Sequence, residues 1–327
     1  MGAVALAAFL AQRTLKAILV ILGVVVFQFV LIRLAPGDPA SVIAGQSGAA
    51  DPLFMQQLRE QFGLDRPLQE QLLIYLRDIL TLDLGFSHRQ QRTVASLIGE
   101  RLPATLLLTG AAFVFALIGG VALGVAASRR VGRPADSVIT VIALTFYATP
   151  IFWVGLLLVL IFSVWLEWLP SFGMFTVGVE LSGLAYALDV SKYLILPALT
   201  LGLFFLAIYA RLARASMLEV ADQDFVRTAH AKGVPEGRIV RVHVLRNALL
   251  PVITFAGIQA GQLVGGSILV ETVFAWPGIG RLAFEALLAR DYAVLLGVFF
   301  CTAVMVVVFN LVTDLLYAVV DPRVEVA

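Results

Sequence analysis

The sequence predicts an all-α membrane protein with six transmembrane helices, and three observations lead to that class. First, 60% of the 327 residues are hydrophobic and 14% are charged, whereas about a quarter of the residues in a soluble domain are charged. Second, the mean hydropathy is +0.96. Third, several apolar runs reach the roughly 20 residues that cross a hydrocarbon core about 30 Å thick, where the backbone must satisfy its own hydrogen bonds and helices are expected.

Net charge and cysteine content argue against several other classes. A net charge of +1 argues against a nucleic-acid-binding protein. The single cysteine, Cys301, lies inside an apolar run, so neither a disulfide framework nor a thiolate metal cluster is available. Its expected role is to fill space as a small apolar side chain.

Six apolar runs are long enough to be spans. The first follows Arg13 and Lys16 and superficially resembles a signal peptide, but Arg33-Leu-Ala-Pro-Gly is not a small-x-small cleavage site, so we expect a retained helix. The third run, around Phe146 to Val164, is the least interrupted. The predicted spans are residues 15–33, 103–127, 138–164, 193–213, 248–271 and 292–320.

Lysine and arginine residues set the expected orientation, because they accumulate in short cytoplasmic connections. With the N-terminus inside, the two short outer loops hold only Lys192, Arg281 and Arg290. Both termini and the polar segment 219–247 are therefore expected to face the cytoplasm. The predicted cytoplasmic cations are Arg13, Lys16, Arg129, Arg130, Arg133, Arg211, Arg214, Arg227, Lys232, Arg238, Arg241, Arg246 and Arg323.

Residues 34–102 are expected to form an extracytoplasmic cap, because charges recur throughout them. Helical apolar spacing predicts one helix over Pro52 to Phe62 and a second over Pro67 to Leu80, with a break at Gly63-Leu-Asp-Arg-Pro67. Asp83-Leu-Gly85 ends the second helix. The cap is either a docking surface or a lid over helix ends. Residues 1–33 then form the N-terminus and first span, and residues 103–327 the core.

Glycine and proline mark special positions in the second and third spans. Pro103 suits the first turn of a helix, and the Gly120/Gly124 spacing allows another helix to approach closely. Pro150, within Tyr147-Ala-Thr-Pro150-Ile-Phe-Trp153, should bend the third span, either opening a cavity or serving packing. Trp165 and Trp168 are typical of an aromatic belt at the outer interface.

Polar residues in the last two spans are candidates for a wet pathway. Gly257, Gly261 and Gly265 share one helix face that should pack against another helix. Gln259 and Gln262 lie off that face, so they line a pathway or hydrogen-bond across helices. Asp314 and Glu271 lie near span ends, so no ionisable group is placed securely at mid-membrane. The tentative pathway residues are Tyr147, Gln259, Gln262, Ser267 and Asn310.

The polar segment 219–251 predicts a helix–glycine–helix hairpin. Asp224 and Lys232 bound a short helix with the charges that each end of a helix dipole prefers. Gly233 follows where a positive φ is needed, and Pro235 prevents continuation. A second helical run covers roughly 236–246. On pattern alone, the segment is a partner-docking loop, an ordinary basic loop or an amphipathic helix at the membrane surface.

Two stretches in this hairpin resemble a known family. Asp224-Phe-Val-Arg-Thr-Ala-His-Ala-Lys-Gly233 and His243-Val-Leu-Arg-Asn-Ala-Leu-Leu-Pro251 resemble the coupling loop of binding-protein-dependent ABC importer permeases, in the version of the oligopeptide, dipeptide and nickel group. In the general signature Glu-Ala-Ala-x3-Gly-x9-Ile-x-Leu-Pro, Gly233 and Leu245 match. The chain differs at Arg227, His243 and Arg246, as the peptide-group variant does.

Other landmarks extend the resemblance along nearly the whole chain, and the long cap is similar to that of the B-type subunit. The matching segments are Arg33-Leu-Ala-Pro-Gly-Asp-Pro39, Gly63-Leu-Asp-Arg-Pro67, Asp83-Leu-Gly85, Arg101-Leu-Pro-Ala-Thr105, Glu271-Thr-Val-Phe-Ala-Trp-Pro-Gly-Ile-Gly280, Arg290-Asp-Tyr292, Asn310-Leu-Val-Thr-Asp314 and Asp321-Pro-Arg323.

The resemblance implies a type I ABC importer permease in the bacterial inner membrane, forming half of a translocation pathway. Its expected partners are a C-type permease, two cytoplasmic ABC ATPases, an extracytoplasmic solute-binding protein and the lipid bilayer. The chain has no Gly-x4-Gly-Lys-Ser/Thr loop, so we expect no cofactor in it and ATP with Mg²⁺ in the ATPases.

The resemblance also assigns roles within the coupling loop, residues 214–247. Phe225, Val226 and Ala229 would enter a groove of the ATPase, Gly233 would permit the turn, and Arg227 and Lys232 would fix the register. The expected coupling residues are Asp224, Phe225, Val226, Arg227, Thr228, Ala229, Lys232 and Gly233.

Two other classes remain as alternatives. A proton-coupled secondary transporter would need titratable groups near mid-membrane. An intramembrane enzyme is disfavoured because His88, His230 and His243 lie outside the spans or at the membrane surface, without metal-ligand spacing. The solute stays open among peptide, nickel, glutathione-like and sugar-derived compounds.

Overall fold

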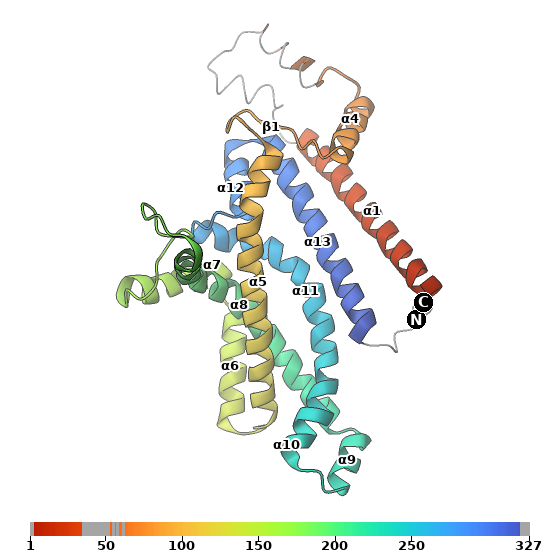
Figure 1. Ribbon diagram of the computed structural model, residues 1–327, viewed down its shortest axis with the longest axis vertical. Helices are drawn as coiled ribbons and strands as arrows, with labels where there is room; N and C mark the ends of the chain where they lie inside the picture. The colour runs from red at the N-terminus through yellow and green to blue at the C-terminus, as the bar shows by residue number, and fades with distance from the viewer. Residues whose placement is uncertain (1–2, 35–52, 54–55, 57–58, 61–62, 321–327) are drawn as a thin grey trace. The chain divides into compact units, whose positions relative to one another are not determined.

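The computed structural model describes residues 3–34, 53, 56, 59–60 and 63–320, with the backbone alone for residues 3–10, 135, 264 and 314–320. Its described part is almost entirely helical (Figure 1) and forms two compact units. The first predicted cap helix, residues 52–62, lies mostly outside the described residues, as do the side chains of Asp314 and Tyr317.

The first unit combines N-terminal and C-terminal segments. It holds the start of α5 (Val94–Ser128) and most of α13 (Tyr292–Val320). Its one described sheet is a two-stranded antiparallel ladder in which Phe86 lies opposite Thr93. The other elements of this unit are α1 (Ala3–Leu34), α4 (Leu68–Leu80), β1 (Phe86–Ser87), β2 (Arg92–Thr93) and α12 (Ile279–Ala289).

The second predicted cap helix is confirmed as α4. Pro67 precedes its first residue, and Gly63 takes a φ of +61° in the turn before it. Beyond its C-terminus, Leu82 has a φ of +58° and the Asp83 Oδ1 accepts a hydrogen bond of 3.0 Å from the Gly85 N–H. The predicted break and end of this helix therefore both occur, because turn residues stand at each end.

The second unit contains the remaining helices and an apolar core. Its largest buried side chains include Leu108, Tyr209 and Trp276. Besides the inner part of α5 and the end of α13, it holds α6 (Pro134–Ala148), α7 (Ile151–Leu158), the π-helical η1 (Val159–Trp165), α8 (Gly183–Ala221), α9 (Asp224–Ala231), α10 (Glu236–Arg238), the π-helical η2 (Ile239–Val244) and α11 (Leu245–Val273).

The predicted glycine contacts are confirmed in α5 and only partly in α11. A Cβ on Gly120 would lie 2.6 Å from the Tyr209 Cβ, so α5 and α8 touch where no side chain fits. Gly257 of α11 is even more closely approached by Thr313 of α13, whose hydroxyl donates to its carbonyl at 3.1 Å. Gly265 faces open space. The predicted glycine stripe thus packs against another helix at Gly257 but not at Gly265.

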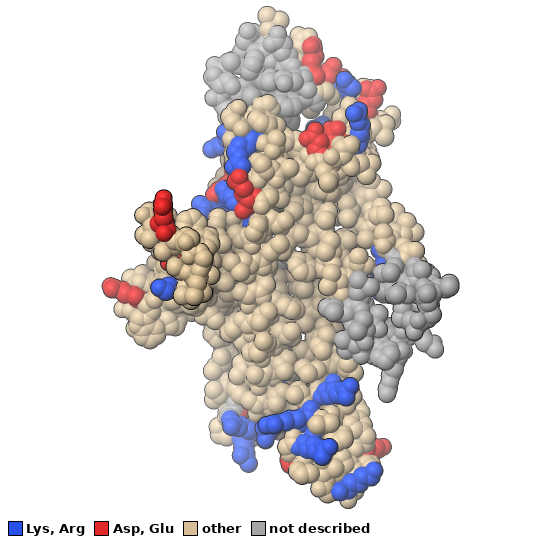
Figure 2. Space-filling model, in the orientation of Figure 1, with Lys and Arg blue, Asp and Glu red and all other residues tan. Residues whose placement is uncertain are grey.

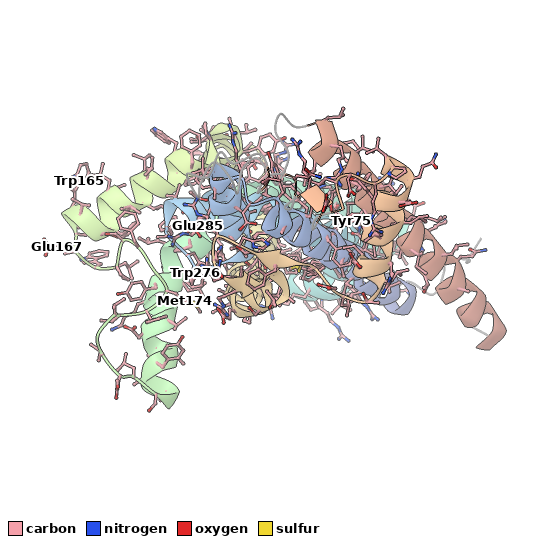
Figure 3. All side chains as sticks on the ribbon, turned by 90° about the horizontal axis from the view of Figure 1, so that it is seen from above. Tyr75, Trp165, Glu167, Met174, Trp276 and Glu285 are labelled. Atoms are coloured by element: carbon pink, nitrogen blue, oxygen red, sulfur yellow. The ribbon has the colours of Figure 1, made fainter. Side chains whose placement is uncertain are left out.

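The third predicted span is not one uninterrupted helix. Helices α6 and α7 are bent by 108° at the Thr149–Pro150 junction, a larger change than the predicted kink. Pro150 lacks the N–H that would continue the helical hydrogen-bond pattern. Figure 3 shows Trp165 and Glu167 at the tip of the α7–η1 segment, and Trp165 and Trp168 are 70% and 69% exposed.

Five described helices are long and apolar enough to cross a membrane, and a sixth results if the bent pair counts as one span. Each predicted span overlaps one of these elements, and most helices are longer than predicted. Helix α5 begins at Val94, so the expected boundary between cap and core at residue 103 lies inside a continuous helix. Apolar periodicity marks the buried part of a helix and not the polar turns that extend it into water.

Candidate functional site

The α9 hairpin, residues 222–244, is the element on which the sequence interpretation depends. Helix α9 is joined through Gly233 to α10 and η2, which run directly into α11. The predicted second helical run is therefore present, but as an α-turn followed by a π-helical turn. Because α8 ends at Ala221 and α11 begins at Leu245, the hairpin lies between the ends of two long helices.

Gly233 closes α9 in the predicted way. Its φ is +72°, its N–H donates to the His230 carbonyl at 2.9 Å, and the Val234 N–H donates to the Ala229 carbonyl at 3.2 Å. These are the two hydrogen bonds of a Schellman motif, which requires a left-handed residue at this position. Nothing lies within 4 Å of where a Cβ would be. The demand on Gly233 is thus conformational and not spatial.

The apolar face of α9 points into the protein, which differs from the predicted docking face. Val226 and Ala229 are 2% and 6% exposed, so they cannot enter a groove of another protein. Phe225, at 40%, is the one member of the predicted trio that is exposed. Val226 and Ala229 pack in a cluster with Met217, Val220, Ile239, Val244 and Ala248. Sequence periodicity locates an apolar face but not the partner that covers it.

The outer surface of α9 is polar and basic. Phe225 flanks exposed Arg227, Thr228 and Lys232. Figure 2 shows lysine and arginine side chains gathered at the end where Figure 1 places α9 and α10. Arg227 pairs with Asp224 at 3.4 Å, but at 71% exposure such a pair contributes little and leaves the guanidinium available.

His230 joins the two halves of the hairpin, a contact that the sequence interpretation did not include. Its Nδ1 is 3.0 Å from the Val226 carbonyl oxygen and its Nε2 is 3.0 Å from Glu236 Oε2. Only the protonated ring can donate both hydrogen bonds. The Val226 carbonyl first and the Glu236 carboxylate second therefore raise the pKa of His230 above its ordinary value of 6.5.

The five tentative pathway residues do not meet in one cavity. Tyr147, Gln262 and Asn310 are exposed. Gln259 is buried, and its Oε1 has no hydrogen-bond partner among the described residues. Ser267 is fully buried and donates to Glu271 Oε1 at 3.1 Å. None of the five lines the cavity of about 500 Å³ in the first unit or the apolar cavity of about 450 Å³ in the second.

A buried carboxylate connects two of the recognised sequence landmarks. Glu271 is fully buried and accepts a hydrogen bond of 2.7 Å from Thr105 Oγ1. The Trp276 indole donates to the Ala104 carbonyl at 2.8 Å. Residues 104–105 of the first landmark and 271–276 of the second thus pack together in the second unit. The four-residue spacing of Ser267 and Glu271 on one helix was visible in the sequence, but the pairing of Thr105 with Glu271 requires the fold.

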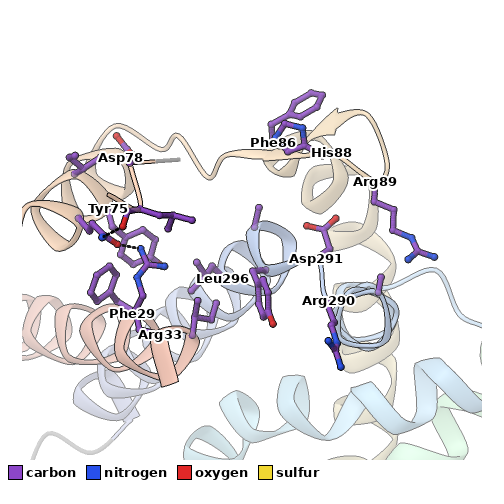
Figure 4. Close-up of a pocket in the computed structure, with 18 of the residues that line it drawn as sticks. Phe29, Arg33, Tyr75, Asp78, Phe86, His88, Arg89, Arg290, Asp291 and Leu296 are labelled. Carbon is purple, nitrogen blue, oxygen red and sulfur yellow. Dashed lines mark hydrogen bonds between the residues drawn. The ribbon is translucent and has the colours of Figure 1, made fainter. Parts of the chain in front are cut away.

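The first unit contains a cavity of about 500 Å³ lined by α1, α4, the β1–β2 turn and the start of α13 (Figure 4). The Arg33 guanidinium lies 4.9 Å from the Phe29 ring centroid and donates to the Gln71 side chain. Burial raises the pKa of Tyr75, which stacks on Phe29, to about 12. The ionisable side chains of the wall also include Asp78, His88, Arg89, Arg290 and Asp291.

Comparisons with known proteins agree with this architecture. Residues 120–326 match the family model described as the binding-protein-dependent transport system inner membrane component. Residues 6–109 match the model for the N-terminal part of such membrane components. Among solved structures, the inward-facing MetNI methionine ABC transporter is similar with a TM-score of 0.53 at 18% identity, covering 69% of this chain and 97% of that one. This likeness concerns the fold alone.

Curated relatives are similar over almost their full length. The oligopeptide transport system permease protein AppB of Bacillus subtilis is 40% identical, with 98% of this chain and all of the relative covered. The dipeptide transport system permease protein DppB of Escherichia coli is 38% identical over 97% of this chain and 98% of the relative. The chain therefore belongs to the family of inner-membrane permease components of binding-protein-dependent transport systems.

Proposed function

We propose that this chain is the B-type permease of an ABC importer for peptides and forms half of its translocation pathway. Its relatives of about 40% identity are permeases of oligopeptide and dipeptide systems. The proposed assembly contains a C-type permease, two cytoplasmic ATPases that hold ATP and Mg²⁺, and an extracytoplasmic solute-binding protein. Six spans, cytoplasmic termini and an extracytoplasmic cap in the bacterial inner membrane complete the proposal.

The observation that carries this proposal is the construction of the α9 hairpin. Phe225 and the surrounding cations are exposed, while Val226 and Ala229 hold the same helix against the end of α8 and the start of α11. A force applied to the outer face of α9 therefore reaches two long helices through a packed cluster. ATP-driven closure of the ATPases would rock these helices between inward- and outward-open states.

The coupling residues then divide into three groups. Asp224, Phe225, Arg227, Thr228 and Lys232 contact the ATPase. Val226 and Ala229 transmit its movement, and Gly233 sets the angle between α9 and the segment leading to α11.

Replacing Gly233 tests the coupling role. Gly233→Val should cost about 1–2 kcal/mol, because a β-branched residue resists the left-handed conformation, whereas Gly233→Asn tolerates it. In proteoliposomes holding the complete transporter, we expect ATP hydrolysis to continue in Gly233→Val while peptide uptake per ATP falls about tenfold. Gly233→Asn should retain near-native coupling. Native uptake by a correctly inserted Gly233→Val transporter contradicts the proposal.

The proton-coupled alternative predicts a different dependence. A secondary transporter would accumulate solute with the ATPases left out and a proton gradient imposed. The proposed importer should show no accumulation under that condition and regain it when ATPases, ATP and the binding protein are restored.

A further inference from the structure

An aromatic and cationic stack lies on the surface shared by α6 and α8. The Tyr147 and Phe204 rings are stacked at 5.3 Å with an interplanar angle of 16°. The Arg211 guanidinium carbon lies 5.7 Å from the Tyr147 ring centroid. Tyr147 is 47% exposed and Arg211 is exposed. Among the described side chains, no carboxylate pairs with Arg211, whereas Arg214 binds Asp136 at 2.7 and 2.8 Å.

Helix geometry shows where the Arg211 cation lies. Helices α6 and α8 are antiparallel, since Asp136 meets Arg214 at one end and Tyr147 meets Phe204 at the other. Side chains on a helix lean toward its N-terminus, so Arg211 and Tyr147 lean toward each other. In the proposed topology, Arg211 therefore extends away from the cytoplasmic end. It does not reach toward cytoplasmic water, as a basic residue near a span end usually does.

The exposed face around Arg211 does not suit lipid. Phe204, Ile208, Arg211 and Ala215 recur at helical spacing on one side of α8, so this face carries an exposed cation within the predicted span 193–213. Charged side chains within spans face a bundle interior or a water-filled cavity, because contact with lipid tails is costly.

The broken backbone beside this face indicates the same environment independently. At the α6–α7 bend, Pro150 cannot donate to the carbonyl four residues earlier, and both Ala148 and Pro150 are exposed. Non-helical backbone at membrane depth is tolerated where it is buried in protein or lines water. An exposed break next to an exposed arginine therefore favours a wet surface.

We propose that Arg211, held by the face of Tyr147, binds the carboxylate of the solute as it passes along this wall of the pathway. This inference rests on the proposed import of peptides, which carry a carboxylate at one end. A guanidinium stacked on an aromatic ring keeps its N–H edge free, and that edge matches a carboxylate with two parallel hydrogen bonds. Tyr147 holds the cation in place, so less side-chain entropy is lost on binding.

Cysteine accessibility tests whether this face is wet. In a Cys301→Ala background of the complete transporter, we expect Tyr147→Cys to react with a negatively charged, membrane-impermeant methanethiosulfonate, and excess tripeptide with ATP to slow the reaction. Ile142→Cys is the matched control, because Ile142 lies on the same helix and is 50% exposed. It should stay unreactive. An unreactive Tyr147→Cys, with and without ATP, overturns the inference, since lipid or the partner permease would then cover the face.

Substituting Arg211 tests whether this residue binds the carboxylate of the solute. Uptake of Ala-Ala-Ala and of its carboxy-terminal amide is measured in proteoliposomes, each relative to the native transporter with the same peptide, so that discrimination by the binding protein cancels. Arg211→Gln should lower uptake of the free acid at least about tenfold and that of the amide less than about twofold, since only the acid loses a charge-assisted hydrogen bond. Uptake of the free acid by Arg211→Lys should lie between that of the native transporter and that of Arg211→Gln.

Equal losses for both peptides would overturn the inference and assign Arg211 to a structural contact or to a carboxylate of the partner permease. Native assembly with the ATPases and a native thermal unfolding curve would show that Arg211→Gln folds. A native transporter that imports neither peptide would overturn the proposed function itself, together with this inference.

Discussion

At the crossing of α5 and α8, a Cβ on Gly124 would lie 2.6 Å from the Ala210 carbonyl oxygen, whereas nothing lies within 4 Å of the corresponding position on Gly233 in the α9 hairpin. The first glycine is required because two backbones touch. The second is required because the chain turns through a left-handed conformation, with a φ of +72°. One residue type thus meets a spatial demand in the helix core and a conformational demand at the surface.

This difference separates residues that maintain the fold from residues that serve coupling. Changes at the crossing should unfold the protein, since a well-packed interior cannot shift to admit new atoms. Changes on the hairpin should act locally, because the hairpin is held by one small cluster and opens without unfolding the long helices.

The largest loss of stability is expected from Gly124→Leu. Its side chain would overlap α8 backbone atoms, at a cost of about 3 kcal/mol or more. Gly110→Leu on the same helix is the control, because nothing lies within 4 Å of Gly110 and it borders an apolar cavity of about 450 Å³. Thermal unfolding in detergent should be lowered strongly by the first change and little by the second. Equal shifts would mean that α5 and α8 are not in close contact.

A smaller loss is expected from Val226→Asp, confined to the hairpin. A carboxylate in the buried cluster should cost about 2–3 kcal/mol and open the hairpin. Thr228→Asp places the same charge on the exposed side of α9 and should leave the hairpin closed. Limited proteolysis of the two variants measures the difference. If both are cleaved alike, Val226 does not lie in a packed cluster.

Phe225→Ala should change the stability of the chain by less than about 0.5 kcal/mol, because the side chain is 40% exposed. Its effect should appear instead in assembly, with affinity for the ATPases about tenfold lower. Titration of purified ATPase onto the permease pair measures this. Unchanged affinity would show that Phe225 is not part of the docking surface. Lys232→Ala is titrated in parallel, because Phe225→Ala does not test the neighbouring residues.

The smallest effect is expected from the titration of His230. Its folded-state pKa lies above its unfolded value, so the stabilisation is complete below 6.5 and is lost as pH rises through the folded-state pKa. Amide exchange in the hairpin should therefore quicken as pH rises through that range, beyond the intrinsic change in exchange rate. Glu236→Gln removes one cause of the shift and should move this transition to lower pH. A transition unmoved by Glu236→Gln contradicts the contact.

The sequence was most informative where local chemistry decides the structure. The Gly233 turn and the α4 boundaries follow from residues adjacent in the chain, since capping and turn formation involve neighbours within a few positions. The Gly120/Gly124 contact was also predictable, because small residues four apart on a span have few other uses.

Sequence reasoning was least informative where distant segments meet. Val226 was assigned to a docking face because an apolar stripe does not reveal which side covers it. The sequence predicted a bend at Pro150 but not its size of 108°, because the direction of α7 depends on contacts with distant segments, such as Gly155 beside Thr200 and Phe274. Nor could spacing alone bring Arg211 to Tyr147, which lie 64 positions apart in the chain.

By itself, the sequence determined that this protein is a multi-pass helical membrane protein, because hydropathy over a span and the chemistry of turns are local properties. Its motifs also led to the importer family. Only the tertiary structure decided which apolar residues are buried inside the chain and which stay exposed for a partner. The physical reason is that burial depends on contacts between separate helices, as where Val226 clusters with Met217 and Ala248, and where Glu271 meets Thr105 from a segment 166 positions away.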